Sequence, residues 1–169
     1  EPSFFSINSN RWEIAKEASI QINKDTVSIS ERKIEQGKQY ISLDGEVSNQ
    51  GDHKLNYSLN SIDLSQLDPF IGGDVHLKGL LNSWGYVAKP LNGLDFIGDA
   101  HIMQFAVNDN EIGDIFAHSE WDEPTKSIKL DGDLMYKTFR TFDFEGTYFT
   151  EGKRNASGEL NYLAFNLVF

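Results

Sequence analysis

Apolar and polar residues alternate along most of this chain, and this alternation limits the folds that the chain can adopt. The pattern is clearest over residues 41–47, 55–59, 128–136 and 142–148, where every second residue is apolar or glycine. Successive side chains of a β-strand point to opposite faces of the sheet, so each segment predicts a strand with one apolar and one polar face. We therefore expect an all-β fold.

Eleven segments are rich in the β-branched, aromatic and leucine residues that are typical of strands. They are residues 3–7, 18–22, 26–34, 39–47, 54–64, 74–81, 95–107, 111–121, 127–136, 141–149 and 159–169. Many of the intervening segments are short and polar. Such loops join antiparallel neighbours, because a parallel crossover needs about a dozen residues. A mostly antiparallel, meandering sheet is expected.

Two segments interrupt the strand pattern. Residues 64–68 are expected to form the one helical turn, with Ser65 as its cap and Pro69 ending it. Residues 84–93 are expected to be irregular. The composition does not change along the chain, so residues 1–169 are predicted to form a single domain.

The two ends of the sequence suggest a fragment of a longer protein. The chain opens at Glu1 without an initiator methionine, and its last ten residues read as an apolar strand without a polar tail. Natural termini are usually polar and frayed. An anchor or targeting segment is therefore expected to lie outside these residues.

Four predicted strands share the pattern apolar-x-Gly-x-apolar. Their glycines are Gly45, Gly79, Gly132 and Gly146, and each lies on the apolar face of its strand. Glycine weakens a strand, so its recurrence indicates sites where the sheet bends or where another group approaches the backbone. Aligned across neighbouring strands, these glycines would curl the sheet into an open half-barrel with an apolar concave face. A β-sandwich with bulges at the glycines is the alternative that this pattern leaves open.

The glycines also indicate an internal repeat. Gly45, Gly79, Gly113 and Gly146 are separated by 34, 34 and 33 residues. This spacing suggests a unit of two strands that is reused along the chain. Coincidence is the alternative in a β-rich chain with 14 glycines.

Charge and composition exclude several classes of function. The chain has 15 Lys and Arg against 26 Asp and Glu, a net charge of −11 that repels nucleic acid and anionic surfaces at long range. It has no cysteine, which excludes disulfides, thiol nucleophiles and thiolate metal sites. No stretch approaches the ~18 apolar residues of a membrane-spanning helix.

The residues that carry chemistry form no catalytic or metal-binding motif. The histidines, to which the sequence assigns no role, are His53, His76, His101 and His118, and their spacing forces no metal site. Asp131, Asp133, Asp143 and Glu145 are expected to share the polar face of neighbouring strands, where a solvated surface is commoner than a catalytic pair. The protein is predicted not to be an enzyme and to hold neither cofactor nor metal.

Six segments, in this order along the chain, resemble a known family. They are Gln39–Ser48, Ile62–Phe70, Leu77–Gly79, Asn108–Ile115, Ser119–Asp122 and Ile128–Gly132. In sequence and spacing they resemble the C-terminal part of the TamB family of translocation and assembly module proteins, AsmA-like proteins of Gram-negative envelopes, in their Bacteroidetes form. The resemblance covers roughly Trp12 to Phe149.

The resemblance implies a periplasmic protein, anchored to the inner membrane by a segment outside these residues, with a curved, taco-like sheet around an apolar groove. Its expected partners are phospholipid or an outer-membrane β-barrel substrate, and an outer-membrane partner protein of the Omp85 type reached through the full-length chain. Acyl chains need only a continuous apolar lining. The residues expected to line the groove are Ile41, Leu43, Val47, Leu55, Tyr57, Leu77, Leu81, Leu130, Leu134, Phe142, Phe144 and Tyr148.

Two other interpretations are open at this point. The same apolar residues could form a closed core, which is the usual fate of such a face. A carbohydrate-binding β-sandwich of a surface or secreted protein is the alternative function, with Trp12, Trp84 or Trp121 stacking on sugars. Trp84, beside Gly85, is the one expected to be exposed, and Trp121 is expected to be buried.

Overall fold

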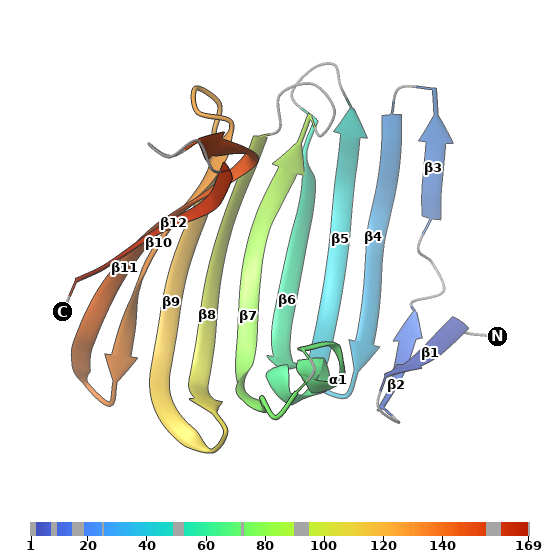
Figure 1. Cartoon of the computed structure of the whole chain (residues 1–169). Coiled ribbons are helices and arrows are strands. Elements are labelled where there is room, and N and C mark those ends of the chain that lie inside the picture. Colours follow the sequence, from blue (N-terminus) through green and yellow to red (C-terminus); the bar gives the residue numbers. More distant parts are fainter. Residues whose placement is uncertain are drawn as a thin grey trace.

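The computed structural model describes residues 3–7, 10–14, 19–24, 26–48, 53–71, 73–89, 95–154 and 160–168. Their twelve strands form one open antiparallel sheet that does not close into a barrel (Figure 1). The strands are β1 (Ser3–Ile7), β2 (Asn10–Ile14), β3 (Ser19–Asn23), β4 (Thr26–Gln36), β5 (Gln39–Ser48), β6 (Leu55–Asp63), β7 (Leu77–Ala88), β8 (Asp95–Val107), β9 (Asn110–Asp122), β10 (Ser127–Tyr136), β11 (Phe139–Arg154) and β12 (Leu160–Val168). The all-β prediction is confirmed.

The sheet is a meander from β4 to β12, because each of these strands pairs with the next one in the chain. At the other edge, β2 and β3 share one side of β4. Ile14 of β2 pairs with Ile34, and Ile20 of β3 pairs with Ile29. The two ends of the chain therefore lie at opposite sides of the sheet (Figure 1). The β-sandwich alternative is wrong for the described residues, because their strands form one sheet.

Two strand predictions need correction. The strand β2 was not predicted, because three of its five residues, Asn10, Arg11 and Glu13, are polar and only Trp12 and Ile14 are apolar. The strand β7 continues to Ala88, so the expected irregular stretch is wrong over residues 84–88. Gly85, which suggested a break, is paired with Tyr57 on one side and with Gly98 on the other. Residues 90–94 lie outside the described part of the chain.

The helical segment after β6 is longer than predicted and has a different cap. A 3-10 turn, η1 (Leu64–Leu67), runs into the short helix α1 (Asp68–Ile71). The cap is Asp63, whose side chain accepts the backbone N–H of Ser65 at 3.0 Å, and not Ser65 itself. Pro69 lies inside α1, near its start, where proline is tolerated because the first N–H groups of a helix have no intrahelical partner.

The described residues form a lean core. The buried apolar residues among them are Trp12, Leu64, Ala88, Ala106 and Leu134. The accessible surface is 11020 Å². A compact folded monomer of the same 19.1 kDa mass would expose about 8,400 Å². The excess follows from the single-layer architecture, in which no second sheet covers the first.

Candidate apolar groove

Strand register gathers the apolar residues on one face of the sheet, here called the apolar face. Two rows of directly paired residues cross the sheet on this face. The first row is Arg32, Leu43, Tyr57, Gly85, Gly98, Ser119, Leu130, Gly146 and Phe165. The second is Ile14, Ile34, Ile41, Leu59, Ser83, Ala100, Ala117, Gly132, Phe144 and Leu167. The sheet therefore presents a nearly continuous apolar or small-residue surface from β2 to β12.

The register brings the predicted groove residues together. Ile41, Leu43, Val47, Leu55, Tyr57, Leu81, Leu130, Leu134, Phe142, Phe144 and Tyr148 all lie on the apolar face. Leu77 lies beyond the irregularity at Gly79, where it pairs with Val107. Leu134 is buried, Tyr148 is exposed, and the other members of the predicted set are half-buried.

Small residues occupy the middle of this face, and aromatic rings lie over them. A Cβ atom on Gly85 would be 2.8 Å from the ring of Tyr57, whose hydroxyl also covers Gly98. A Cβ atom on Gly132 would be 2.5 Å from Cζ of Phe144. Glycine at these positions leaves the space that the two rings occupy over the neighbouring strands.

The predicted sheet-bending glycines are of two kinds. Gly132 and Gly146 lie beneath aromatic rings of the next strand, Phe144 and Phe165. Gly45 and Gly79 differ from these two in backbone conformation, with φ of +119° and +132°. Only glycine adopts that backbone readily. A side chain on Gly45, Gly79 or Gly132 would press against a backbone carbonyl oxygen. Close approach of a neighbouring group, one of the two predicted roles, is therefore found at all four glycines.

The 34-residue spacing corresponds to one pair of strands. Gly45, Gly79 and Gly113 lie on β5, β7 and β9, and all three have φ between +119° and +132°. Gly146 lies on β11, but without a positive φ. The sequence repeat therefore corresponds to a shared backbone conformation at Gly45, Gly79 and Gly113.

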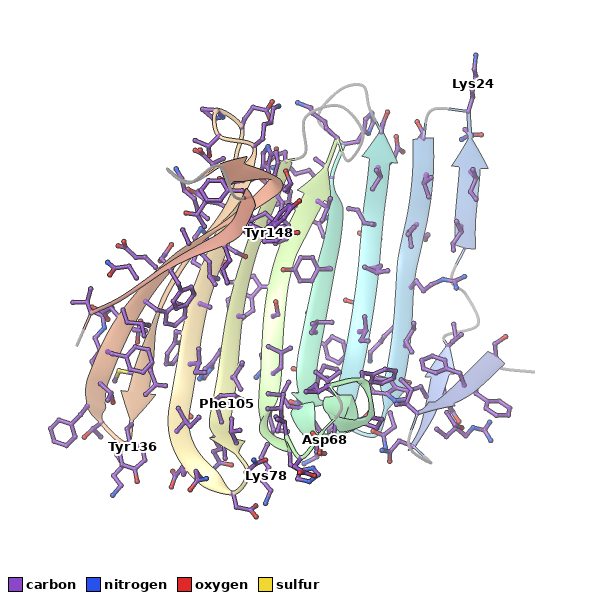
Figure 2. All side chains as sticks on the ribbon, viewed as in Figure 1. Lys24, Asp68, Lys78, Phe105, Tyr136 and Tyr148 are labelled. Atoms are coloured by element: carbon purple, nitrogen blue, oxygen red, sulfur yellow. The ribbon has the colours of Figure 1, made fainter. Side chains whose placement is uncertain are left out.

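The apolar face stays exposed at both edges of the sheet. On β12, Leu163 and Phe165 are 63% and 52% exposed, and Ile22 of β3 is 76% exposed. Figure 2 displays the side chains along the ribbon, with Tyr148 of β11 near the β12 edge. Apolar patches of this extent usually mark a binding surface.

One charged side chain, Arg32, lies at the β4 end of the first row. It pairs with Leu43 across the strands β4 and β5. Its Nε atom is buried and has no hydrogen-bond partner within the described residues. Sequence reasoning missed Arg32. The signal that could have found it is a basic residue two positions before Ile34, which belongs to the apolar alternation.

The segment of η1 and α1 is attached to one end of the apolar face. The amide of Gln66 donates to the side-chain oxygen of Gln39 at 3.0 Å, and that oxygen also accepts the backbone N–H of Asp63 at 2.8 Å. Figure 1 shows α1 beside the lower ends of β5 and β6. Phe70 of α1 is 72% exposed, so the segment adds apolar surface of its own.

Asp68, the first residue of α1, holds this segment to β7. Its carboxylate accepts the backbone N–H of Leu77 at 2.9 Å and lies 3.1 Å from Nδ1 of His76. The hydrogen bond from Leu77, and then that from His76, hold the pKa of Asp68 below its ordinary value. The ionised carboxylate is therefore part of the attachment.

The acidic residues predicted to share the polar face do so. Asp131 pairs with Glu145, and Asp133 pairs with Asp143 across β10 and β11. Arg140 lies between the second pair, with Nε at 2.6 Å from Asp143 and a terminal nitrogen at 3.5 Å from Asp133. These carboxylates thus lie opposite the apolar face.

Each of the four histidines lies beside one carboxylate. The pairs are His53 with Glu46, His76 with Asp68, His101 with Asp114, and His118 with Asp99, at 3.0, 3.1, 3.9 and 2.8 Å. The hydrogen bond that His118 donates to the carboxylate of Asp99 raises the pKa of His118. Within the described ranges, no three His, Asp or Glu side chains are grouped as metal ligands would be.

The tryptophans differ in exposure. Trp84 is 53% exposed, as expected, whereas Trp121 is half-buried and Trp12 is buried. None of the described helices is long and apolar enough to cross a membrane. A comparison of the chain with family models, curated proteins and solved structures gives no match.

Proposed function

We propose that the apolar face binds the acyl chains of phospholipid. In this proposal the chain is a non-enzymatic part of a periplasmic protein that conducts phospholipid between membranes, assists the assembly of outer-membrane β-barrel proteins with an outer-membrane partner, or does both. The periplasmic location, the inner-membrane anchor and the partner rest on the family resemblance.

The observation that carries the lipid proposal is the uncovered apolar face. Two rows of paired residues extend over most of the sheet without a second layer on them in the described structure. Burying each methylene of an acyl chain on such a surface contributes about 0.8 kcal/mol and needs no directional contact. A long, open and weakly specific surface suits a ligand that moves along it.

Arg32 supports a phospholipid over a neutral lipid. A guanidinium group at one side of the apolar face offers paired N–H donors to a phosphate group. The acyl chains of the same molecule would then lie along the neighbouring half-buried residues of β5 and β6, which include Leu43, Tyr57 and Leu59.

The first experiment tests lipid binding with two neighbouring substitutions on β5. Leu43→Asp puts a carboxylate on the apolar face, and Ser42→Asp puts the same group on the polar face, where Ser42 pairs with Lys33 and Ser58. Leu130→Asp repeats the test on β10. Phospholipid that copurifies with each protein is extracted and quantified, and folding is checked by circular dichroism.

We expect the wild type and Ser42→Asp to carry phospholipid, and folded Leu43→Asp and Leu130→Asp to lose most of it. Folded variants at Leu43 and Leu130 that retain the wild-type amount would contradict the proposal. Unfolding of both variants, together with a wild type that takes up no lipid from vesicles, would indicate that the apolar face is a sealed core.

A further inference from the structure

One end of the apolar face is covered, in contrast to the rest of that face. The described strands form a single layer, so most of the apolar face has no second sheet over it. At the lower ends of β5 and β6, however, the segment of η1 and α1 lies beside the strands (Figure 1). Its side chains Leu64 and Gln66 are buried, although few other side chains of the described residues are. The segment therefore packs against the sheet through these two residues.

Strand register places this contact on the apolar face. Gln39 lies two positions before Ile41 on β5, so the side chains of both residues point to the same face. The side-chain oxygen of Gln39 accepts the amide of Gln66 at 3.0 Å and the backbone N–H of Asp63 at 2.8 Å. The turn η1 also packs against β7. The segment thus reaches across the ends of three neighbouring strands, β5 to β7.

A third row of paired apolar residues leads across the sheet to this covered end. From β10 to β6 the row consists of Leu134, Ile115, Ile102, Leu81 and Ile62. Leu64 of η1 follows two positions after Ile62, the last member of the row, and is buried. An acyl chain that lies on this row over β8 to β10 would therefore meet η1 as it extends toward β6.

The segment is held to the sheet mainly near its two ends. The attachment at Gln39 joins neutral groups, and hydrogen bonds between neutral groups add little net stability. At α1, Asp68 accepts the backbone N–H of Leu77. Phe70 and Ile71 are exposed, so the outer side of α1 is uncovered. Because residues 64–71 belong to no strand, the segment can leave the apolar face without breaking the pairing of β6 with β7.

We infer that the segment of η1 and α1, residues 64–71, is a strap that closes one end of the groove, and that an acyl chain passes this end only when the strap leaves Gln39. This role rests on the proposed lipid function, which it makes more specific. It gives the groove a closed end at β5 to β7 and leaves the row on β8 to β10 free for an acyl chain.

The test maps the positions of acyl chains along the third row. Vesicles of phosphatidylcholine with a diazirine at the end of one acyl chain are mixed with the whole chain and irradiated, and tandem mass spectrometry locates the adducts residue by residue. In the wild type we expect adducts at Ile102 and Ile115, on the open part of the row. Few adducts are expected at Ile62 and Leu81, beside the strap.

Two substitutions that each remove an amide at the same end of the sheet separate strap release from a general loosening of the strands. Gln39→Ala removes the acceptor that holds the strap, whereas Asn60→Ala removes an amide of the polar face. We expect Gln39→Ala to raise the adducts at Leu81 relative to those at Ile115 by about fivefold. Asn60→Ala should leave this ratio unchanged.

Circular dichroism checks the folding of each variant, and Asp68→Ala, which removes the attachment at α1, is a second way to release the strap. It should raise the same ratio. Equal adducts at Leu81 and Ile115 in the wild type, a ratio that neither release variant raises, or an equal rise with Asn60→Ala would overturn the strap. Absence of adducts from the whole row in every protein would contradict the lipid proposal, and the strap with it.

Discussion

At the scale of single residues, pairs of glycine and an aromatic ring account for part of the apolar face. The pairs Gly132 with Phe144 and Gly146 with Phe165 are direct cross-strand neighbours. In each, the ring occupies the space above the glycine. The ring thereby covers backbone that a strand glycine would otherwise leave open to water.

The pair of Gly146 and Phe165 gives a stability prediction, because the ring is the nearest obstacle there. A Cβ atom on Gly146 would lie 2.9 Å from the ring of Phe165, while the nearest backbone atom would be 3.5 Å away. We expect Gly146→Ala to lower the free energy of unfolding by about 1 kcal/mol. In a Phe165→Ala background, Gly146→Ala should lower the free energy of unfolding only slightly. Urea unfolding of the wild type, the two single variants and the double variant gives the coupling free energy between the two residues. If Gly146→Ala lowers the free energy of unfolding equally in both backgrounds, the ring does not occupy this space.

Arg32 gives a second prediction at this scale. Arg32→Gln should weaken binding of phosphatidylglycerol by about tenfold and leave binding of neutral diacylglycerol unchanged, because only the phosphate gains from the guanidinium group. Lys33→Gln is the matched control, since it removes the same charge from the polar face, where Lys33 pairs with Ser42. Lipid transfer from vesicles to the protein measures both. An equal loss of phosphatidylglycerol binding in the two variants would show that the effect comes from net charge alone.

At the scale of secondary-structure elements, the segment of η1 and α1 depends on ionised Asp68. A depressed pKa means that the carboxylate stabilises the folded state at any pH above its value in the unfolded chain, about 4. That contribution is lost as the pH falls through the lower pKa of the folded state.

Acid unfolding therefore provides an element-scale test. We expect Asp68→Asn to be less stable than the wild type at pH 7, and this difference to be smaller at about pH 2, where more of the Asp68 carboxylate is protonated. Urea titrations at the two pH values, followed by circular dichroism, measure this difference. A stability gap that is the same at both pH values would exclude the ionised carboxylate as the cause.

The elements also show how far sequence reasoning reaches. Period-two alternation predicted most of the strands and, with them, the two faces, because side-chain direction in a strand follows from position alone. The alternation could not predict that Gly85 pairs with Tyr57, since these residues are 28 positions apart and their pairing depends on the register between β6 and β7. Sequence reasoning named Ser65 as the cap where the structure has Asp63, and it ended the turn at Pro69, because cap geometry depends on where β6 ends. Trp84 was predicted to be exposed, but its cross-strand neighbour Asp99 on β8 is known only from the folded sheet.

At the scale of the whole molecule, one layer of sheet separates two different surfaces. One face carries apolar and small residues, and the other carries carboxylates, histidines and a few exposed rings. A closed barrel or a sandwich would hide the first of these faces. The open meander leaves it accessible from both edges, which is the property that a lipid-binding groove requires.

The most direct test is a photo-crosslinking scan along β5 with a benzophenone amino acid. It is placed in turn at Ile41, Ser42, Leu43, Asp44, Glu46 and Val47, and each protein is irradiated with labelled vesicles of phosphatidylethanolamine and phosphatidylglycerol. We expect lipid adducts at Ile41, Leu43 and Val47 and few at the other three positions, since successive side chains face opposite sides of the sheet. Adducts that ignore this alternation, or their absence from all six positions, would contradict a lipid-binding apolar face.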